Sequence, residues 1–412
     1  MKIPGSLKFT GKDPSIVGKG KSEILRALAL KFRLQKDFNE RAKQDFHGKA
    51  PSVFVGSHGY PFVNTGFLSS EEYADNDNPL KWSREGSSKF DILKIIGLRS
   101  SLVNSRFKVS VKDAARFSDR LRDVSISAKP VDAEVSLEKK PYFNVSLDRD
   151  LLPHGPAVPL KLFRVTENPK VPRAVEKAES DHDLRAGEAV TGLFGKGIDE
   201  HYLSRVFSAG NLGLKSERKI VPTKWSITAV DDIIGKKQSL SLIRDFKEHE
   251  YACFFGGYLG NYYLAIIIPG PWSYELFETY VGAGLSNPSI FESASDFEGV
   301  FGRKSYASNT VGGYYAARLA ALEYFGRVKR RGKVLLLRFI TDEYWAPLGV
   351  WVVREAARKA FSSRKVVFGS FSEIVSYARD LCLARFNLDV NVLFGRSLLL
   401  KYDWEQKTLS NY

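Results

Sequence analysis

Two adjacent carboxylates, Asp231 and Asp232, are the pair in this 412-residue chain whose residue types best suit chemistry. They end a stretch, residues 218–232, that mixes basic, hydroxyl and aromatic side chains and contains Lys224. Neighbouring carboxylates can bind a divalent cation, or one of them can act as a general base. The alternative is that Asp232 or its neighbour caps a helix that begins nearby.

A second group of candidate residues lies between Glu292 and Arg318. Gly312 and Gly313 precede a run of Ala, Leu and Tyr that predicts a helix, and a helix N-terminus offers free N–H groups to an anion. The residues expected at a phosphate pocket are Lys224, Gly312, Gly313 and Arg318, with Asp231, Asp232 and Arg318 as catalytic candidates and Glu292 and Asp296 as further members. Close helix packing through small residues is the alternative, because the chain has neither a G-x-x-x-x-G-K-S/T loop nor a G-x-G-x-x-G motif.

The last seven residues place Gln406, Leu409 and Tyr412 at three-residue intervals. In a helical turn with three residues per turn, such side chains lie on one side, so Leu409 and Tyr412 would form an apolar plug. The spacing resembles the peptide by which replication and repair proteins bind the DNA sliding clamp. That peptide usually ends in two aromatics, whereas this chain has one. A frayed tail without a partner is the alternative.

The net charge of +15 is unevenly distributed, because residues 1–50 hold twelve Lys and Arg against five Asp and Glu. A basic arm favours polyanionic partners, of which nucleic acid is the usual soluble one. This electrostatic attraction carries no sequence specificity. The alternative is the lysine-rich surface of a heat-adapted protein, in line with the single Met.

Hydrophobic residues at 43% and aromatics at 13% exclude wholesale disorder. No apolar run approaches the roughly 20 residues that a membrane span requires, and the N-terminus lacks a signal-peptide pattern. Cys253 and Cys382 are distant from each other and lie in apolar contexts, and the six histidines do not cluster with them. We therefore expect buried thiols, no zinc site, no membrane partner and a cytoplasmic protein.

Periodicity predicts the elements that must position these candidates. Helices are expected within residues 22–46, 90–106, 184–209, 354–361 and 371–386, and strands at 51–56, 262–268, 333–340, 348–353 and 391–402, with further strands and loops between 129 and 172. Residues 255–261 read as a hairpin turn, although their glycines would also let a ligand approach the backbone. No clean βαβ repeat is present. The fold class expected is α+β, with a mixed sheet core, flanking helices and a disordered C-terminal peptide tail.

Several segments resemble the archaeal Nre family of repair-associated proteins. The similar segments are 51–56, 59–61, 98–103, Arg205 with 208–210, 221–232, 257–261, 312–318 and 344–355. The resemblance implies a basic N-terminal arm and helix at 1–48, an Nre N-terminal-type domain at 49–290, a C-terminal-type α/β region at 291–402 and a clamp-interacting tail at 403–412. Many members carry an N-terminal cysteine cluster that resembles a zinc module. This chain has no such cluster, so zinc is not carried over.

The resemblance implies a DNA-repair accessory protein that is recruited to the PCNA sliding clamp through Gln406, Leu409 and Tyr412. Its body would bind DNA or a nucleotide, and the protein would associate with the nucleoid during repair. The alternative is a nucleotide- or nucleic-acid-processing enzyme with a pocket around Asp231, Asp232 and Arg318. A structural scaffold is the third option. The resemblance supplies no reaction, so whether the chain is an enzyme stays open at this point.

Overall fold

The structure is a computed structural model, and it describes residues 32–71, 77–86, 88–112, 118–143, 155–282 and 287–405. The chain divides into two compact units. The first, here called the barrel unit, comprises Leu25–Ile234 with Ala346–Leu348. The second, the sheet unit, includes Gly235–Trp345 and Gly349–Tyr412. The boundary between them falls inside one long helix, α8 (Thr223–Asp245).

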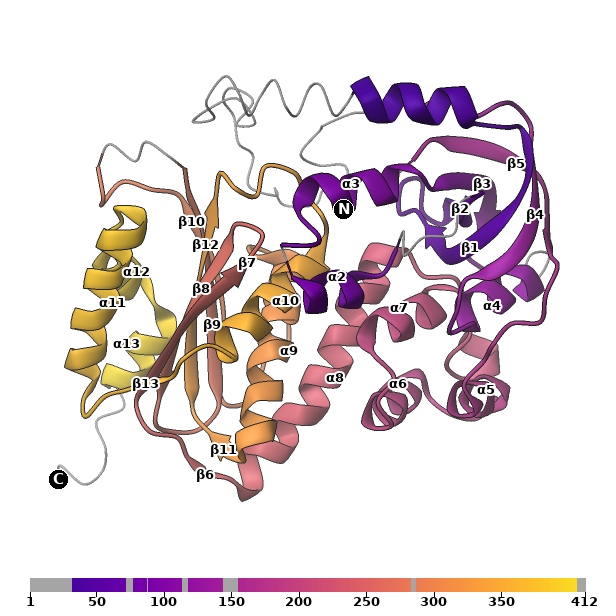
Figure 1. The fold of residues 1–412 in the computed structure, drawn as a ribbon. Coiled ribbons are helices and arrows are strands. Elements are labelled where there is room, and N and C mark those ends of the chain that lie inside the picture. Colours follow the sequence, from indigo (N-terminus) through magenta and orange to yellow (C-terminus); the bar gives the residue numbers. More distant parts are fainter. Residues whose placement is uncertain are drawn as a thin grey trace. The chain divides into compact units, whose positions relative to one another are not determined.

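The barrel unit is built on a closed barrel of five strands in the order β1-β2-β3-β5-β4 (Figure 1). The strands are β1 (Asp45–Val55), β2 (Phe62–Ser70), β3 (Val103–Ser110), β4 (Val131–Leu137) and β5 (Ala157–Val165). Only β3 and β5 pair in parallel; the other four pairings are antiparallel. This strand order, with a helix between β3 and β4, is that of the Greek-key barrel called the OB-fold.

The interior of the barrel follows from alternation along its strands. In β4, Val131, Ala133, Val135 and Leu137 are buried and the residues between them are not, as expected for a strand with one face in a core. Phe67 of β2 and Phe163 of β5 stack inside, with ring centroids 3.6 Å apart. Leu121 and Val124 of α4 (Ser118–Ile126) join the same core, so this helix packs against the barrel interior.

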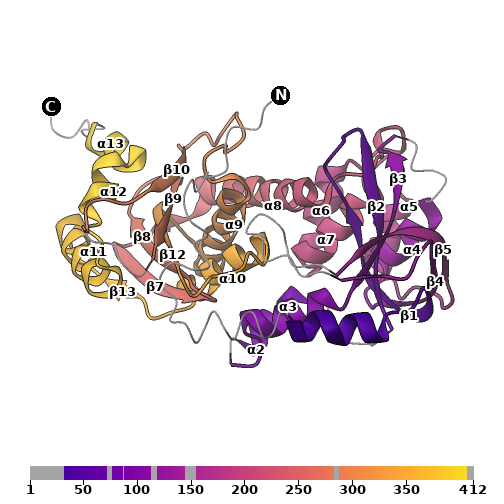
Figure 2. The same cartoon turned by 90° about the horizontal axis from the view of Figure 1, so that it is seen from above.

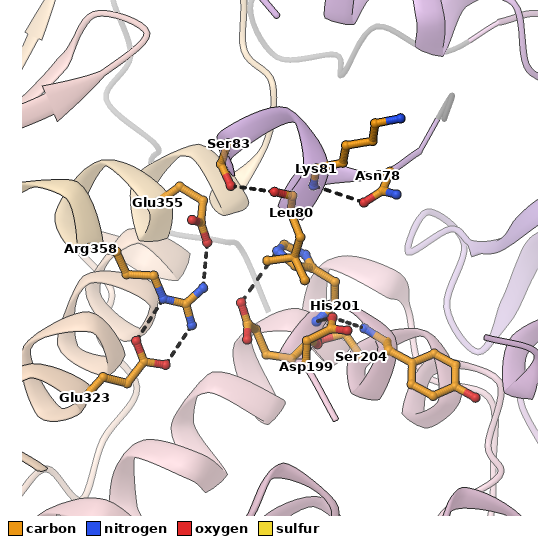
Figure 3. Close-up of polar contacts among 12 residues, drawn as sticks. Asn78, Leu80, Lys81, Ser83, Asp199, His201, Ser204, Glu323, Glu355 and Arg358 are labelled. Atoms are coloured by element: carbon orange, nitrogen blue, oxygen red, sulfur yellow. Dashed lines mark hydrogen bonds and ion pairs between the residues drawn. The ribbon is translucent and has the colours of Figure 1, made fainter. Parts of the chain in front are cut away.

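Other helices complete the barrel unit. They are residues 32–41, α2 (Pro79–Glu85), α3 (Ile92–Ser100), α5 (Arg173–Ser180), α6 (Ala186–Gly195), α7 (Glu200–Ser208) and the first part of α8, together with a short 3-10 turn at Lys215–Glu217. The N-termini of three of them have side-chain caps. Asp91 accepts from Lys94 N, and Asp199 accepts from His201 N and Tyr202 N. Asn78 accepts from Lys81 N (Figure 3). Such caps satisfy the first N–H groups of each helix.

The sheet unit is built on a six-stranded sheet in the order β10-β9-β12-β8-β7-β13. The strands are β7 (Ala252–Tyr258), β8 (Asn261–Ile268), β9 (Ser273–Val281), β10 (Ser293–Glu298), β12 (Lys333–Thr341) and β13 (Val366–Val367), and a separate parallel pair joins β6 (Lys247–Glu248) to β11 (Arg330–Arg331). Within the large sheet only β9 and β12 run parallel. The expected α+β class with a mixed sheet core is therefore confirmed.

Helices cover both faces of this sheet. Figure 2 shows α9 (Val311–Val328) and α10 (Val350–Phe361) on one face, with α11 (Phe371–Phe386), α12 (Asn391–Arg396) and α13 (Leu398–Glu405) on the other. Because both faces are covered, the central strands are apolar almost throughout: Tyr263–Ile268 and Val334–Leu337 are buried without alternation. None of the described helices is long and apolar enough to cross a membrane.

The predicted hairpin at residues 255–261 is confirmed, and its turn requires the backbone conformation of Gly260. Tyr258 pairs with Asn261, so Leu259 and Gly260 form a two-residue loop. Both have positive φ, 49° and 73°, as a type I′ turn requires. A Cβ on Gly260 would lie 2.4 Å from Tyr344 N, so the backbone approach at this glycine is made by the protein itself.

The predicted strand at residues 391–402 is wrong, because this segment forms α12 and α13. Its apolar run has the length of a buried strand, but a distant carboxylate sets its structure. Glu275 of β9 accepts from Ser397 Oγ at 2.5 Å and from the backbone N–H groups of Leu398 and Leu399 at 3.1 and 3.0 Å. The carboxylate therefore caps α13 from outside the segment.

Two other predictions need correction. Residues 348–353 were predicted as a strand, but α10 begins at Val350, after Gly349 with φ 102°. The helix expected within 90–106 is present but shorter than this range, because α3 ends at Ser100 and β3 begins at Val103. Residue type alone therefore does not fix where these elements end. The helical prediction at 184–209 is confirmed, although the segment forms two helices, α6 and α7. The helix at 371–386 and the strands at 51–56, 262–268 and 333–340 are also confirmed.

Candidate nucleic-acid interface

One face of the barrel unit combines exposed aromatic rings with exposed cations. On strands β2 and β3 the register pairs Phe62 with Ser110, Asn64 with Lys108 and Gly66 with Arg106. Directly paired residues point to the same side of a sheet, so Phe62, Lys108 and Arg106 share the outer face of the barrel. All three side chains are exposed.

Two further exposed aromatic side chains lie on backbone that adjoins these strands. Tyr60, in the loop between β1 and β2, is 47% exposed, and Trp225, in the first turn of α8, is 44% exposed. Their ring centroids are 5.2 Å apart with the planes tilted by 57°. Thr223 fixes the start of α8 there, because its hydroxyl accepts the N–H of Val55 at 2.9 Å.

Three lysines continue the surface across neighbouring backbone. Val111 N donates to Pro61 O, and Ile220 N donates to Val111 O. Lys112 directly follows Val111, Lys219 directly precedes Ile220, and Lys224 directly precedes Trp225. The three lysines are exposed. Within the described part of the chain none of them is paired with a carboxylate. No described carboxylate therefore compensates their positive charge.

We call this region the aromatic–basic surface and define it by Tyr60, Phe62, Arg106, Lys108, Lys112, Lys219, Lys224 and Trp225. Exposed rings give every base a face on which to stack, and nearby cations attract phosphates. In OB-folds the corresponding region, the face of strands 2 and 3 with the loop between strands 1 and 2, binds oligonucleotides and oligosaccharides. The arrangement on this chain suits an unpaired polyanion whose bases are accessible.

The candidate carboxylates Asp231 and Asp232 lie in the interior of α8, well after its start at Thr223. The interpretation that one of them caps the beginning of this helix is therefore wrong. Asp231 is 1% exposed and Asp232 is partly buried. Consecutive helical residues point about 100° apart, so the two side chains diverge. Lys224, in contrast, lies on the aromatic–basic surface.

The predicted helix start at Gly312 and Gly313 is confirmed, since α9 begins at Val311. A carboxylate of the protein already lies at this end. Asp296 Oδ2 accepts from Asn309 N at 3.0 Å, from Thr310 N at 2.7 Å and from Thr310 Oγ1 at 2.9 Å. A Cβ on Gly313 would lie 2.4 Å from Glu278 Oε1, so close packing accounts for this glycine.

Arg318 is 3% exposed and forms an ion pair with Glu298, with Nε 2.7 Å from Oε1. The same carboxylate oxygen accepts from Trp272 Nε1 at 2.9 Å. A second buried ion pair joins Arg338 to Glu278, with Nη1 2.5 Å from Oε1. Asn261 Oδ1 accepts a hydrogen bond from the same guanidinium. The charge of Arg318 is thus balanced inside the sheet unit. Burial raises the pKa of the neighbouring Tyr314 hydroxyl far above its usual value.

The candidates of the predicted pocket fall into separate groups. Glu292 is exposed, whereas Asp296 is buried and paired with Arg303 at 3.1 Å. Lys224, Asp231 and Asp232 belong to the barrel unit, and Glu292, Asp296, Gly312, Gly313 and Arg318 belong to the sheet unit. A shared catalytic pocket of these residues stays a prediction. The candidates Gln406, Leu409 and Tyr412 and the first 31 residues of the basic arm lie outside the described residues.

Arg205, one of the residues similar to the family pattern, has a structural role in the barrel unit. Its guanidinium donates to three backbone carbonyls: Ser125 O at 3.0 Å, Pro51 O at 2.7 Å and Ser127 O at 2.6 Å. Burial lowers the pKa of this guanidinium. The rigid fork of an arginine suits three separate acceptors, so Arg205 ties α7 to β1 and to the end of α4.

The segment 344–355 ends at Glu355, a member of another charge network, which Figure 3 shows on α9 and α10. Arg358 contacts both carboxylate oxygens of Glu323, at 2.8 and 2.7 Å, and Glu355 Oε1 at 2.6 Å. Two carboxylates therefore surround one guanidinium. This network offers no excess positive charge for a phosphate.

The aromatic–basic surface was largely missed by the sequence analysis. Lys224 was identified, but Tyr60, Phe62 and Trp225 were not assigned a role, because they meet only when β2 pairs with β3 and α8 packs beside them. The aromatics beside the Gly-Tyr-Pro turn were the available signal, because several apolar side chains gathered at a surface turn can mark an interaction site.

Comparison with known proteins places the chain in a family. The chain belongs to the archaeal Nre family: the family model "Archaeal Nre, N-terminal" matches residues 20–286, and "Archaeal Nre, C-terminal" matches residues 298–412. The resemblance that the sequence segments indicated is thereby confirmed.

Three relatives are similar over most of their length. The DNA repair protein NreA of Haloferax volcanii is 34% identical over 83% of this chain and 84% of its own. The DNA repair protein NreB of Archaeoglobus fulgidus is 33% identical over 89% of this chain and 92% of its own. The DNA repair protein NreA of the same organism is 36% identical over 80% of this chain and 83% of its own. No solved structure matches the chain.

Proposed function

We propose that this chain is a DNA-repair accessory protein whose barrel unit binds single-stranded DNA through the aromatic–basic surface and whose C-terminal peptide binds the PCNA sliding clamp. Its relatives carry the name DNA repair protein. The observation that carries the DNA-binding part is the group of Tyr60, Phe62 and Trp225, all 44–56% exposed, beside lysines that have no carboxylate partner among the described residues. Such a protein acts in the cytoplasm, associated with the nucleoid during repair.

Single-stranded DNA fits this surface better than intact duplex. Three rings on one face can stack only with bases that are unpaired, and the phosphates between those bases would meet Lys112, Lys219 and Lys224. The barrel topology supports the same conclusion by analogy, because this fold uses this face for oligonucleotides in other proteins. The basic arm would add affinity without sequence preference.

The test is binding of a fluorescein-labelled oligonucleotide, measured by anisotropy over a range of salt concentrations. Each stacked base is worth about 1–3 kcal/mol, so Trp225→Ala should raise Kd roughly 5- to 150-fold. Tyr142→Ala is the matched control, because Tyr142 is also an exposed aromatic residue, at 69%, but follows β4 and is outside both the aromatic–basic surface and the basic arm. Equal Kd values for the two variants would contradict the proposed interface.

The lysines are tested by the salt dependence of the same binding. Removing one phosphate contact should reduce the slope of log K against log salt by about 0.7 for single strands. Lys219→Gln and Lys224→Gln should each do so, and Lys177→Gln on α5, an exposed lysine outside the surface, should not. A slope that is unchanged in all three variants would assign the phosphate contacts elsewhere, for example to the basic arm.

The clamp contact is tested by deleting residues 406–412 and measuring binding to purified PCNA by calorimetry. The full chain should bind and the truncated chain should not, while both bind the oligonucleotide equally. Because the tail offers only Leu409 and Tyr412 as apolar anchors, we expect weak clamp binding that becomes tighter when DNA held by the same clamp also binds the body. Unchanged clamp binding after deletion would refute this part of the proposal.

A further inference from the structure

The loop between β10 and α9 carries the most exposed aromatic side chain of the described residues. Phe301 is 102% exposed. It stands at the tip of a tight turn in which Gly302 N donates to Gly299 O at 2.9 Å, and the two glycines form an antiparallel bridge. A large apolar ring at full exposure adds nothing to the folded core, so its position calls for another explanation.

The guanidinium of Arg303 holds the backbone of this turn in place through several hydrogen bonds. Arg303 donates to Phe297 O at 2.8 Å, to Ser305 O at 3.3 Å and to Tyr306 O at 3.3 Å. It also pairs with the buried carboxylate of Asp296 at 3.1 Å and lies 5.3 Å from the centre of the Tyr314 ring. The backbone on both sides of Phe301 is therefore fixed to the sheet unit.

The loop that carries Phe301 also has exposed polar residues and one exposed lysine. Lys304 and Ser305 follow Phe301 in this loop and are exposed, as is Ser308, and Lys304 has no ion pair within the described part of the chain. Tyr306, 53% exposed, packs on Tyr315 with ring centroids 5.3 Å apart. A protein partner usually covers a contiguous apolar patch. A fully exposed ring at the tip of a fixed turn, in a loop that carries a lysine, instead matches the side chains that DNA-binding proteins insert between base steps.

We propose that Phe301 is a wedge that enters the base stack of DNA where pairing is already weakened, such as a mismatch, a gap or a strand end. Lys304 contacts a flanking phosphate, and Tyr306 offers a face to the displaced base. Unstacking costs least at a weakened step, which makes this wedge selective for the state of the duplex and not for its sequence. The inference rests on the proposed DNA binding but concerns the sheet unit, separate from the aromatic–basic surface.

The experiment uses the full chain and duplexes that carry 2-aminopurine beside a mismatch, a gap or neither. Wild-type protein should raise the fluorescence of the probe at the mismatch and at the gap but not in the intact duplex. Phe301→Ala should abolish the rise and weaken binding to the mismatched duplex by roughly 5- to 150-fold, the range for one stacked ring. Phe301→Trp should restore both signals.

Controls separate this inference from the proposed function. Ile290→Ala removes another exposed apolar side chain of the sheet unit, 72% exposed, and should change neither signal. Because Phe301 is fully exposed, Phe301→Ala should leave the melting temperature unchanged. Tight binding of mismatched duplex by Phe301→Ala, or an undiminished fluorescence rise, overturns the wedge while DNA binding stands. Failure of the wild-type chain to bind any DNA overturns both. Loss of binding to a repair protein, with unaltered DNA signals, would assign Phe301 to a protein interface.

Discussion

The buried pair of Arg318 and Glu298 gives the most quantitative prediction on the stability of the sheet unit. The two side chains are 3% and 2% exposed and 2.7 Å apart. Removing one partner of a buried pair leaves an uncompensated charge and costs about 3–5 kcal/mol. Arg318→Met should therefore lower the melting temperature by roughly 6–20 °C, at about 2–4 °C per kcal/mol for a unit of this size.

The double variant separates the charge from the packing. In Arg318→Met with Glu298→Gln both charges are gone, and the amide oxygen of the glutamine can still accept from Trp272 Nε1. Replacing a whole buried pair by neutral groups of similar volume is often close to neutral. We therefore expect the double variant within about 2 kcal/mol of wild type, with a coupling energy of about 3 kcal/mol or more between the two sites.

Urea unfolding of the four proteins of this cycle measures the coupling energy. Lys365→Met is the control, because both side chains of its pair with Glu250 are 41% exposed and exposed pairs contribute about 0–1 kcal/mol. An Arg318→Met variant that loses less than the control would refute the reasoning. Such a result would also favour the prediction that Arg318 binds a phosphate, because its replacement would then cost little stability.

Other predictions concern single side chains. Arg205→Lys keeps the charge but cannot reach three separate carbonyls. Because each buried acceptor left unpaired costs about 1–3 kcal/mol, chemical denaturation should show that the free energy of unfolding falls by roughly 2–4 kcal/mol. Wild-type stability would contradict the assigned role. Lys329 ends α9 at φ 53°, so Lys329→Gly should raise stability by about 0.5–1 kcal/mol in the same assay. A decrease there would show that the lysine contact with the Phe246 ring, at 5.3 Å, matters more than the backbone. Burial raises the pKa of both thiols, that of Cys382 to about 12, so at pH 8 Cys253 and Cys382 should stay protonated and react with a thiol reagent only after unfolding; rapid labelling of the folded protein would contradict their burial.

Local sequence predicted those elements whose signals lie within the element itself. The helix at residues 371–386 matches α11 at both ends, because Ser370 caps its first turn and Asn387, at φ 49°, ends it. The hairpin around Leu259 and Gly260 was likewise predictable from its turn residues. These elements depend little on the rest of the chain.

Elements that depend on distant groups were not predictable in the same way. The apolar run at residues 391–402 reads as a strand until Glu275, on a strand more than a hundred residues earlier, caps α13. Likewise, Val350–Val353 favour a strand by residue type, yet they begin α10, whose small residues pack closely on the sheet: a Cβ on Gly256 would lie 3.1 Å from Ala360 Cα. In both cases long-range packing decides the outcome.

The same distinction applies to the candidate sites. The pairing of carboxylates with Arg318 and Arg303, and the position of Asp296 at the start of α9, follow from the register of β9, β10 and α9 and not from local spacing. Residue types alone therefore suggested a phosphate site where the fold places internal ion pairs. Conversely, the exposed rings of Tyr60 and Trp225 are 165 residues apart in sequence and become one surface only in the folded barrel unit.

Photo-crosslinking tests the central claim most directly. A single-stranded oligonucleotide that contains 5-iodouracil is bound to the full chain, irradiated, and the adducts are located by mass spectrometry. The account predicts adducts at Tyr60, Phe62 or Trp225, lost when an unlabelled oligonucleotide competes. Adducts confined to other parts of the chain, with none at these three rings, would contradict the assignment of the aromatic–basic surface as the nucleic-acid interface.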